Sequence, residues 1–206
     1  HTLAEDETIA RLACGVRRFR MPDEFNFIRL YQDLGATPGA WQDQALDALA
    51  GIFEDRRQYP RAAEYWRLSI QLRPEERKTR WLEQIVANWG AFEPFSTQPA
   101  DGRGATFDFR FRNGKAVSFE AHEVLVPRLL EDVKTYLKSN PNQVDWSRLN
   151  LGDLGHQLVT KEQRQYLGRK AAEWRLDLDP RPMHFDRRVT VQTPVEVQDR
   201  KSTRLN

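Results

Sequence analysis

Several features that define whole classes of protein are scarce or missing in this 206-residue sequence. Its single cysteine, Cys14, excludes an internal disulfide and any metal site built on several thiolates. No stretch approaches the roughly 20 consecutive apolar residues of a membrane-spanning helix. The 32 basic and 30 acidic residues are interspersed and leave a net charge of only +2. We therefore expect neither a membrane span nor the basic footprint of a nucleic-acid-binding protein.

The lone cysteine says little about the compartment. Cys14 lies between Ala13 and Gly15 in a segment with helical spacing, and no histidine or lysine flanks it to activate the thiol. We expect a buried structural thiol. One cysteine suits a cytosolic protein and an exported bacterial protein equally, so the sequence leaves the localisation open.

Both ends of the chain favour a piece of a longer protein. The sequence begins at His1 without an initiator methionine or a signal peptide. Residues 198–206 have no periodicity and resemble translated sequencing-adapter DNA. We expect this tail to be non-native, the alternative being a disordered or clipped native strand.

The first half of the chain has helical periodicity. Apolar residues recur every three or four positions in five stripes, within residues 9–16, 27–34, 46–53, 62–70 and 82–89. Helix breaks separate them, at Pro22, Gly35, Pro60, Pro74 and Gly90. This pattern predicts an antiparallel α-hairpin array over residues 1–92.

Residues 43–76 match one 34-residue tetratricopeptide unit. Small residues let the paired helices approach closely, and large residues fill the gaps beside them. A lone repeat cannot bury both faces, so neighbouring helices are required. Such arrays commonly bind peptides in a concave groove; packing only against the rest of the chain is the alternative that we favour for so short an array. The motif positions are Leu46, Leu49, Ala50, Phe53, Tyr59, Ala62, Trp66 and Pro74.

The composition changes after Gly90, and residues 93–102 have the Pro, Ser and Gly content of a connector. Residues 103–197 then predict a β-rich, sandwich-like module with an inserted helix over 125–137. Strands are expected over 173–178 and 188–192 from their alternation, and residues 146–170 remain open between strand and helix. The chain is thus predicted to be an α+β protein.

A hairpin is predicted around Asn113 and Gly114. A three-residue turn with Gly114 in the left-handed conformation would pair Phe109 with Val117 and Phe107 with Phe119. That register places these side chains on one apolar face.

No pattern in the sequence predicts catalysis, a cofactor or a metal. His122-Glu123 begins like a zinc-protease motif, but position 126 is valine where the second histidine belongs. The strand around Phe107 contains phenylalanine and arginine, as the RNA-binding surfaces of some sheets do. Its phenylalanines form a single apolar face, however, which is more typical of a strand that packs on a core. We therefore expect no enzyme activity and no nucleic-acid partner.

Three segments carry a family resemblance: residues 84–94 with NWGAFEP, 103–115 with FDFRFRNGK, and 172–194 with EWRLDLDPRP. They resemble the N-terminal region of large bacterial alpha-2-macroglobulin-like proteins, in the form where tetratricopeptide helices precede the first macroglobulin-type β domains. The resemblance is an extended pattern over roughly residues 3–195.

The resemblance implies a part in a protease trap. In such proteins a protease cleaves a bait segment, the β-sandwich domains rearrange, and an internal thioester can couple to the attacker. Cys14 is followed by Gly-Val-Arg and does not match the thioester motif, so no trapping residue transfers to this chain. The implied role is structural. The implied partners are the remaining domains of the parent chain and, for the full-length protein, proteases in a periplasmic or extracellular compartment.

Two functions therefore stand as hypotheses. The first is the N-terminal scaffold of a macroglobulin-like protease inhibitor without its bait region and thioester. The second is a tetratricopeptide adaptor that binds a partner protein or peptide through its helical groove.

Overall fold

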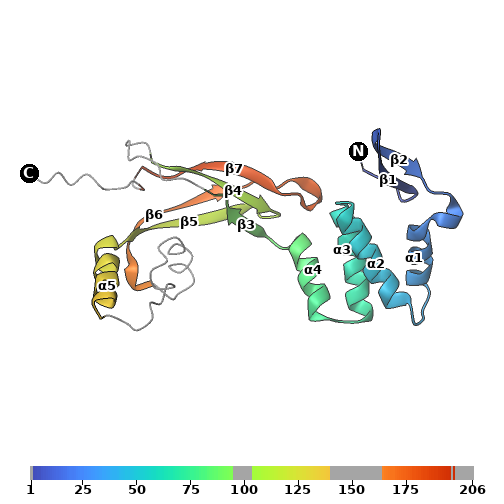
Figure 1. Cartoon of the computed structure of the whole chain (residues 1–206), viewed down its shortest axis with the longest axis horizontal. Helices are drawn as coiled ribbons and strands as arrows, with labels where there is room; N and C mark the ends of the chain where they lie inside the picture. The colour runs from blue at the N-terminus through green and yellow to red at the C-terminus, as the bar shows by residue number, and fades with distance from the viewer. Residues whose placement is uncertain (1, 95–103, 140–163, 196, 198–206) are drawn as a thin grey trace, which may run out of the picture. The chain divides into compact units, whose positions relative to one another are not determined.

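The computed structural model describes residues 2–94, 104–139, 164–195 and 197. Within these residues the chain is mixed α+β, with five α-helices and antiparallel sheets (Figure 1). Three predictions lie mainly or wholly outside the described residues: the connector 93–102, the segment 146–170 and the tail 198–206.

The described residues belong to two compact units. The first contains the chain up to Glu93 together with residues 109–115 and 178–189. The second contains the other described parts, chiefly the strand segments 104–108, 116–124 and 167–177 and one helix. The first unit therefore combines the helical half with short segments from the β-rich half.

Four helices form the body of the first unit. They are α1 (Phe27–Ala36), α2 (Gln42–Asp55), α3 (Tyr59–Leu72) and α4 (Glu76–Val86), and they lie side by side in chain order (Figure 1). The Asn26 side chain accepts a hydrogen bond from the Arg29 amide and caps α1, and Pro60 stands in the first turn of α3. These four helices confirm the stripes predicted within residues 27–34, 46–53 and 62–70 and the first part of the stripe predicted within residues 82–89.

The helix predicted over residues 9–16 is wrong. This segment forms two antiparallel strands, β1 (Glu7–Leu12) and β2 (Gly15–Arg20), joined by a two-residue turn at Ala13-Cys14. Gly15 has a φ of 114°, a backbone conformation that residues other than glycine rarely adopt. This conformation is incompatible with an α-helix through residues 9–16. Cys14 is exposed at the turn, which corrects the predicted buried thiol.

The fifth helical stripe is also shorter than predicted. Helix α4 ends at Val86, and residues Trp89–Phe92 form β3, which pairs antiparallel with β4 (Thr106–Arg112). Trp89 lies opposite Arg112 in that register, so it belongs to a strand and not to the helix. A hydrophobic spacing of three and four residues therefore continued past the true end of the helix.

The predicted β4–β5 hairpin is wrong in its pairing. Strand β4 lies between β3 and β7 (Arg187–Gln192), whereas β5 (Ala116–Val124) pairs antiparallel with β6 (Leu167–Asp177). Asn113, not Gly114, adopts the left-handed conformation, with a φ of 61°. The turn at Asn113 and Gly114 is real, but it connects two strands of different sheets.

The apolar faces were nevertheless assigned correctly. The rings of Phe107 on β4 and Phe119 on β5 meet edge to face with centroids 5.3 Å apart, and Phe119 stacks on Trp174 of β6 at 5.3 Å. Period-two alternation defines which side chains share a face, but it does not define which strand lies alongside.

One helix accompanies the strands of the second unit. Helix α5 (Val126–Lys138) confirms the helix predicted over residues 125–137. It buries Leu129 against Tyr166 and Leu167, and the Tyr166 hydroxyl donates a hydrogen bond of 2.8 Å to Asp132. The strands predicted over 173–178 and 188–192 correspond to β6 and β7.

Candidate functional site in the helical unit

The tetratricopeptide-like positions form the core of the first unit. Leu46, Leu49, Ala50, Phe53, Ala62 and Trp66 are buried in the contact between α2 and α3 and its neighbours. Tyr59 is half-buried at the start of α3, and Pro74 is exposed in the link between α3 and α4. The residues chosen from the repeat pattern are therefore scaffold, and any binding chemistry must come from the side chains around them.

A buried lysine, which sequence reasoning missed, joins three helices. Lys78 on α4 has no exposed surface, and its Nζ lies 2.5 Å from Asp43 Oδ1 and 3.2 Å from Asp47 Oδ1 on α2. The same Nζ is 2.8 Å from the Ser69 hydroxyl on α3. A buried charge needs such partners, so this network is a fully paired structural element. Its signal in the sequence was that Lys78 precedes Leu82 and Ile85 on the inner stripe of α4.

A shallow groove of about 540 Å³ runs between α2 and α4. Its floor is aromatic: the rings of Trp66 and Trp81 have centroids 4.8 Å apart, and the Arg77 guanidinium lies 4.8 Å from the Trp81 ring centroid. Gly51 leaves one wall open, since a Cβ there would meet no atom within 4 Å. The groove thus offers apolar area with charged residues at its edge.

A larger cleft of about 950 Å³ lies at the junction of α2 and α3. It is bounded by the N-terminal segment, the end of α2, the start of α3 and the turn at residues 183–185. The lining includes Arg56, Arg57 and Arg61 from the α2–α3 junction. Arg57 and Met183 in this lining both have positive φ, 57° and 63°, which is uncommon for residues other than glycine.

The N-terminal segment is held in this cleft mainly through its backbone. Arg56 donates from Nη1 to the Ala4 carbonyl at 3.1 Å and from Nη2 to the Glu7 carbonyl at 2.8 Å. Gln58 Nε2 donates to the Leu3 carbonyl at 2.7 Å. Burial lowers the pKa of Arg56, and the nearby Glu5 and Glu7 oppose that shift. These donors hold the start of β1 and the turn before it, in which the Glu7 amide donates to the Ala4 carbonyl at 3.1 Å.

The Glu5 side chain of this segment is also bound by side chains of the helices. The Glu5 carboxylate accepts hydrogen bonds from Arg61 and, at 2.9 Å, from Gln32 Nε2. Arg61 is positioned for this contact because its guanidinium also lies over the rings of Phe53 and Tyr65, at 5.3 and 5.6 Å from their centroids. Two helices, α1 and α3, therefore contribute to one acidic-residue pocket.

The predicted turn residue Asn113 forms a separate polar node at the end of α4. Its Nδ2 donates to the carbonyls of Ile85 and Ala87 at 2.8 and 2.9 Å, and its Oδ1 lies 2.8 Å from His184 Nδ1. Because Oδ1 can only accept, His184 Nδ1 carries the hydrogen. Burial lowers the pKa of His184, and the charges of Arg67 and Arg112 lower it further.

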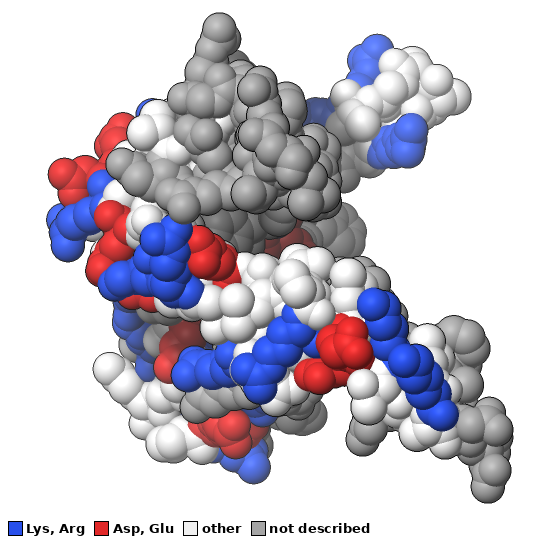
Figure 2. Space-filling model, turned by 90° about the vertical axis from the view of Figure 1, so that its left-hand side faces the viewer, with Lys and Arg blue, Asp and Glu red and all other residues white. Residues whose placement is uncertain are grey.

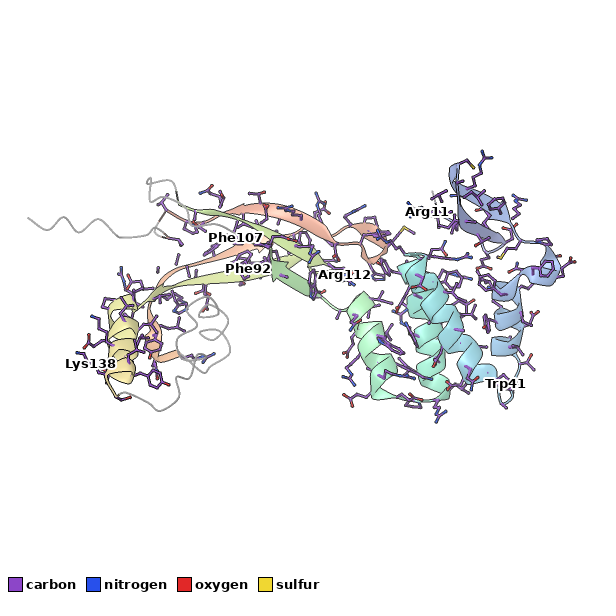
Figure 3. The ribbon with its side chains drawn as sticks, viewed as in Figure 1. Arg11, Trp41, Phe92, Phe107, Arg112 and Lys138 are labelled. Carbon is purple, nitrogen blue, oxygen red and sulfur yellow. The ribbon has the colours of Figure 1, made fainter. Side chains whose placement is uncertain are left out.

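Arg112 completes this node beside Asn113. It donates to the Gln84 carbonyl and, from Nε, to Asp186 at 2.8 Å. Figure 3 labels Arg112 on the ribbon. The carbonyls at the end of a helix have no partners within it. The β4–β5 turn thus caps α4 with side chains that come from far along the chain.

In the parts of the chain that the structure describes, no three His, Cys, Asp or Glu side chains gather as metal ligands, and no helix is long and apolar enough to cross a membrane. Acidic and basic side chains alternate on the face shown in Figure 2. His122 lies on β5 with Nε2 3.3 Å from Glu120, and His156 is outside the described residues.

Comparison with known proteins leaves the family open. No family model, no curated protein and no solved structure matches the chain. The function must therefore be argued from the geometry above.

Proposed function

We propose that this chain is a non-catalytic structural module, the N-terminal scaffold of a bacterial alpha-2-macroglobulin-like protease trap. The observation that carries this proposal is the node at Asn113, through which the β-rich segment caps helix α4. It favours a fixed scaffold over a free adaptor for the following reason.

An adaptor needs only a helical array on a linker, and its helix ends are capped locally or by water. Here helix α4 is capped by Asn113 and Arg112, 28 residues along the chain from the carbonyls of Ile85 and Gln84. Phe185 adds an edge-to-face contact with Tyr59 at the start of α3, with centroids 5.4 Å apart. The helices and the strand ends thus share one compact unit, as a rigid entry module requires.

The second unit supports the same proposal. Phe107, Phe119 and Trp174 form an aromatic layer between strands that belong to different sheets. Such a layer between two sheets is the core arrangement of a β-sandwich. A macroglobulin-type module is the sandwich that the sequence resemblance implies.

The test begins with the genomic DNA beyond the codon for residue 197, read in an independent assembly. The proposal expects the reading frame to continue into further β-sandwich domains and a bait segment. The expressed full-length product should then be cleaved by a protease at that segment and become more compact in solution scattering. A frame that stops shortly after residue 195, or a product that stays unchanged in shape after cleavage, would overturn the proposal.

A second candidate function, peptide binding by an adaptor, is favoured by the α2–α4 groove. The Trp66 and Trp81 rings, which meet at a tilt of 41°, and the bare surface at Gly51 suit an apolar side chain of an extended peptide. An adaptor would use this groove and would not need the β-rich segment.

The groove can be tested on the whole chain by a pull-down from lysate of the source organism. Gly51→Lys places a long charged side chain on the open wall, while Gln71→Lys adds the same charge at an exposed position of α3 outside the groove. An adaptor loses its captured partner with Gly51→Lys and keeps it with Gln71→Lys. Equal capture by both variants would count against the adaptor.

A further inference from the structure

We propose that helix α1 is a self-association surface, which pairs antiparallel with the α1 helix of a second copy of this chain. This inference goes beyond the scaffold role and concerns a face separate from the α2–α4 groove. It rests on an exposed apolar stripe along α1 and on charged side chains beside it that become complementary when the helix is paired with itself.

Helix α1 has a buried face and an open face. It stands at the outer end of the row of four helices, next to α2 (Figure 1). Ile28 and Gly35 are buried on the side that packs against α2. The open face carries Leu30, which keeps 58% of its surface exposed, between Phe27 and Leu34, which are also exposed. Helices in a helical array ordinarily bury such a stripe against a neighbour.

The open face continues past the start of the helix into a shallow groove of about 430 Å³. Phe25, Phe27 and Leu30 supply its apolar lining, and Phe25 keeps 69% of its surface exposed. Specific stable interfaces bury roughly 1,200–2,000 Å² in total, whereas a ten-residue helix is only about 15 Å long. We therefore expect a reversible dimer that forms as the chain concentration rises.

The charges of α1 lie along one flank of this face. With about 3.6 residues per turn, the other two apolar side chains lie to one side of Leu30, and Arg29 and Asp33 lie to the other. Arg29 lies 3.5 Å from Asp23, but both side chains are largely exposed, so this ion pair is readily exchanged. Within the described residues no hydrogen bond or ion pair engages the Asp33 carboxylate. Both charges are thus available to a partner.

An antiparallel pair makes the open face complementary to itself. A two-fold axis beside Leu30 brings like flanks of the two helices together and runs them in opposite directions. Phe27 then lies opposite the partner's Leu34, and Arg29 lies opposite the partner's Asp33. Each of these contacts forms twice. A parallel pair would instead place the charged flank of one helix against the apolar flank of the other, so the charges select the antiparallel arrangement.

The first test is sedimentation equilibrium of the whole chain at increasing concentration, where we expect a monomer–dimer equilibrium. Leu30→Arg would bring two guanidinium groups together across the two-fold axis and should weaken dimerisation at least about tenfold. The matched control is Leu68→Arg on α3, which makes the same change at a residue that is 47% exposed and lies outside this face. The control should dimerise like the parent chain, and thermal melts should show that both variants are folded.

The antiparallel register is tested by exchanging the charges. Arg29→Glu alone sets carboxylates opposite each other, and Asp33→Arg alone sets guanidinium groups opposite each other. Each variant by itself should dimerise about tenfold more weakly than the parent chain. An equimolar mixture of the two should recover dimers, because every charge of the mixed pair again meets its opposite. The same mixture with Leu30→Arg in both chains should not recover them.

Three outcomes would overturn the proposal. The first is a chain that stays monomeric at every concentration, which would assign the open face to another partner or to solvent. The second is a dimer that Leu30→Arg leaves intact. The third is a mixture of the two charge variants that dimerises no better than either alone. Because none of these measurements uses the parent protein or a protease, their failure leaves the scaffold proposal standing.

Discussion

Two antiparallel hairpins in the first unit, α2–α3 and β1–β2, have similar apolar spacing but differ in how far their apolar side chains are buried. In the α2–α3 hairpin Leu49, Ala50 and Ala62 are completely buried. In the β1–β2 hairpin Ile9 keeps 56% of its surface exposed and Val16 keeps 65%. Apolar periodicity alone therefore does not identify an element that faces the core. The apolar stripe is buried only where another part of the chain packs against it.

The strand register explains why β1–β2 buries so little. Ile9 lies opposite Arg18, and Val16 lies opposite Arg11. Residues directly opposite share a face of the sheet, so each apolar side chain has a charged neighbour. Neither face is uniformly apolar, and the hairpin cannot contribute a continuous surface to the core.

The sharpest test of this contrast exchanges one phenylalanine in each hairpin. Phe53 is 1% exposed and stacks on Tyr65, whereas Phe19 is 43% exposed. We expect Phe53→Ala to lower the free energy of unfolding by about 4 kcal/mol through lost burial and a cavity. Phe19→Ala should lower it by less than about 0.5 kcal/mol. Urea unfolding with matched m-values measures both, and equal losses would abolish the distinction between the hairpins.

The next largest loss of stability is expected for a buried ion pair, and we compare it with the loss for an ion pair at the surface. Lys78→Ala removes a cation without exposed surface and leaves Asp43 and Asp47 facing each other, so we expect a loss of about 3 kcal/mol. Arg18→Ala breaks an ion pair with Glu7 in the strand hairpin and should cost less than about 1 kcal/mol. The same unfolding experiment checks this, and high salt should reduce only the Arg18 effect. A Lys78→Ala chain as stable as the parent would show that the network contributes nothing.

The turn at Asn113 is the third connection to be compared, by the stability that is lost when its key residue is replaced. Asn113→Ala removes two hydrogen bonds to α4 carbonyls and places a Cβ-bearing residue without a stabilising amide at positive φ. We expect a loss of about 2 kcal/mol. Asn113→Gly keeps the conformational freedom and should lose only about 1 kcal/mol, which is the hydrogen-bond part. Thermal unfolding followed by circular dichroism separates the two, and identical losses would mean that conformation plays no part.

The smallest effect on stability is expected at the tip of the strand hairpin. Cys14 is exposed in the turn between β1 and β2, so Cys14→Ser should change the free energy of unfolding by less than about 0.5 kcal/mol. A thiol reagent should modify Cys14 in the native chain as fast as in urea-unfolded chain at the same pH. Marked protection of the native thiol would indicate that the tip is covered in solution.

The four helices of the first unit were predictable because each has a long apolar stripe, although the end of α4 was not marked by the predicted break at Gly90. The alternation in β4, β5, β6 and β7 likewise assigned strands and their faces. Two short segments with weak signals were predicted wrongly. In residues 9–16 four apolar residues at helical spacing also suit a twisted strand, and at Trp89 the apolar spacing continued beyond the end of the helix. Neither error can be recognised from the sequence, because it depends on what residues 9–16 and Trp89 pack against.

The candidate site was less predictable than the fold. The repeat residues marked the core, but the cleft depends on donors from the α2–α3 junction meeting an N-terminal segment some fifty residues earlier in the chain. Arg56 and Gln58 looked like ordinary polar turn residues. Only their distance to the carbonyls of Leu3 and Glu7 gives them a role.

The sequence by itself determined the four helices of the first unit, the α+β class and the apolar faces of the strands β4 to β7, because these follow from spacing within one segment. Tertiary structure decided that residues 7–20 form strands, that β4 and β5 lie in different sheets, and that Asn113 caps α4. Each of these depends on a contact between segments remote in the chain. Local periodicity cannot report such contacts, since it records which side chains share a face and not what covers that face.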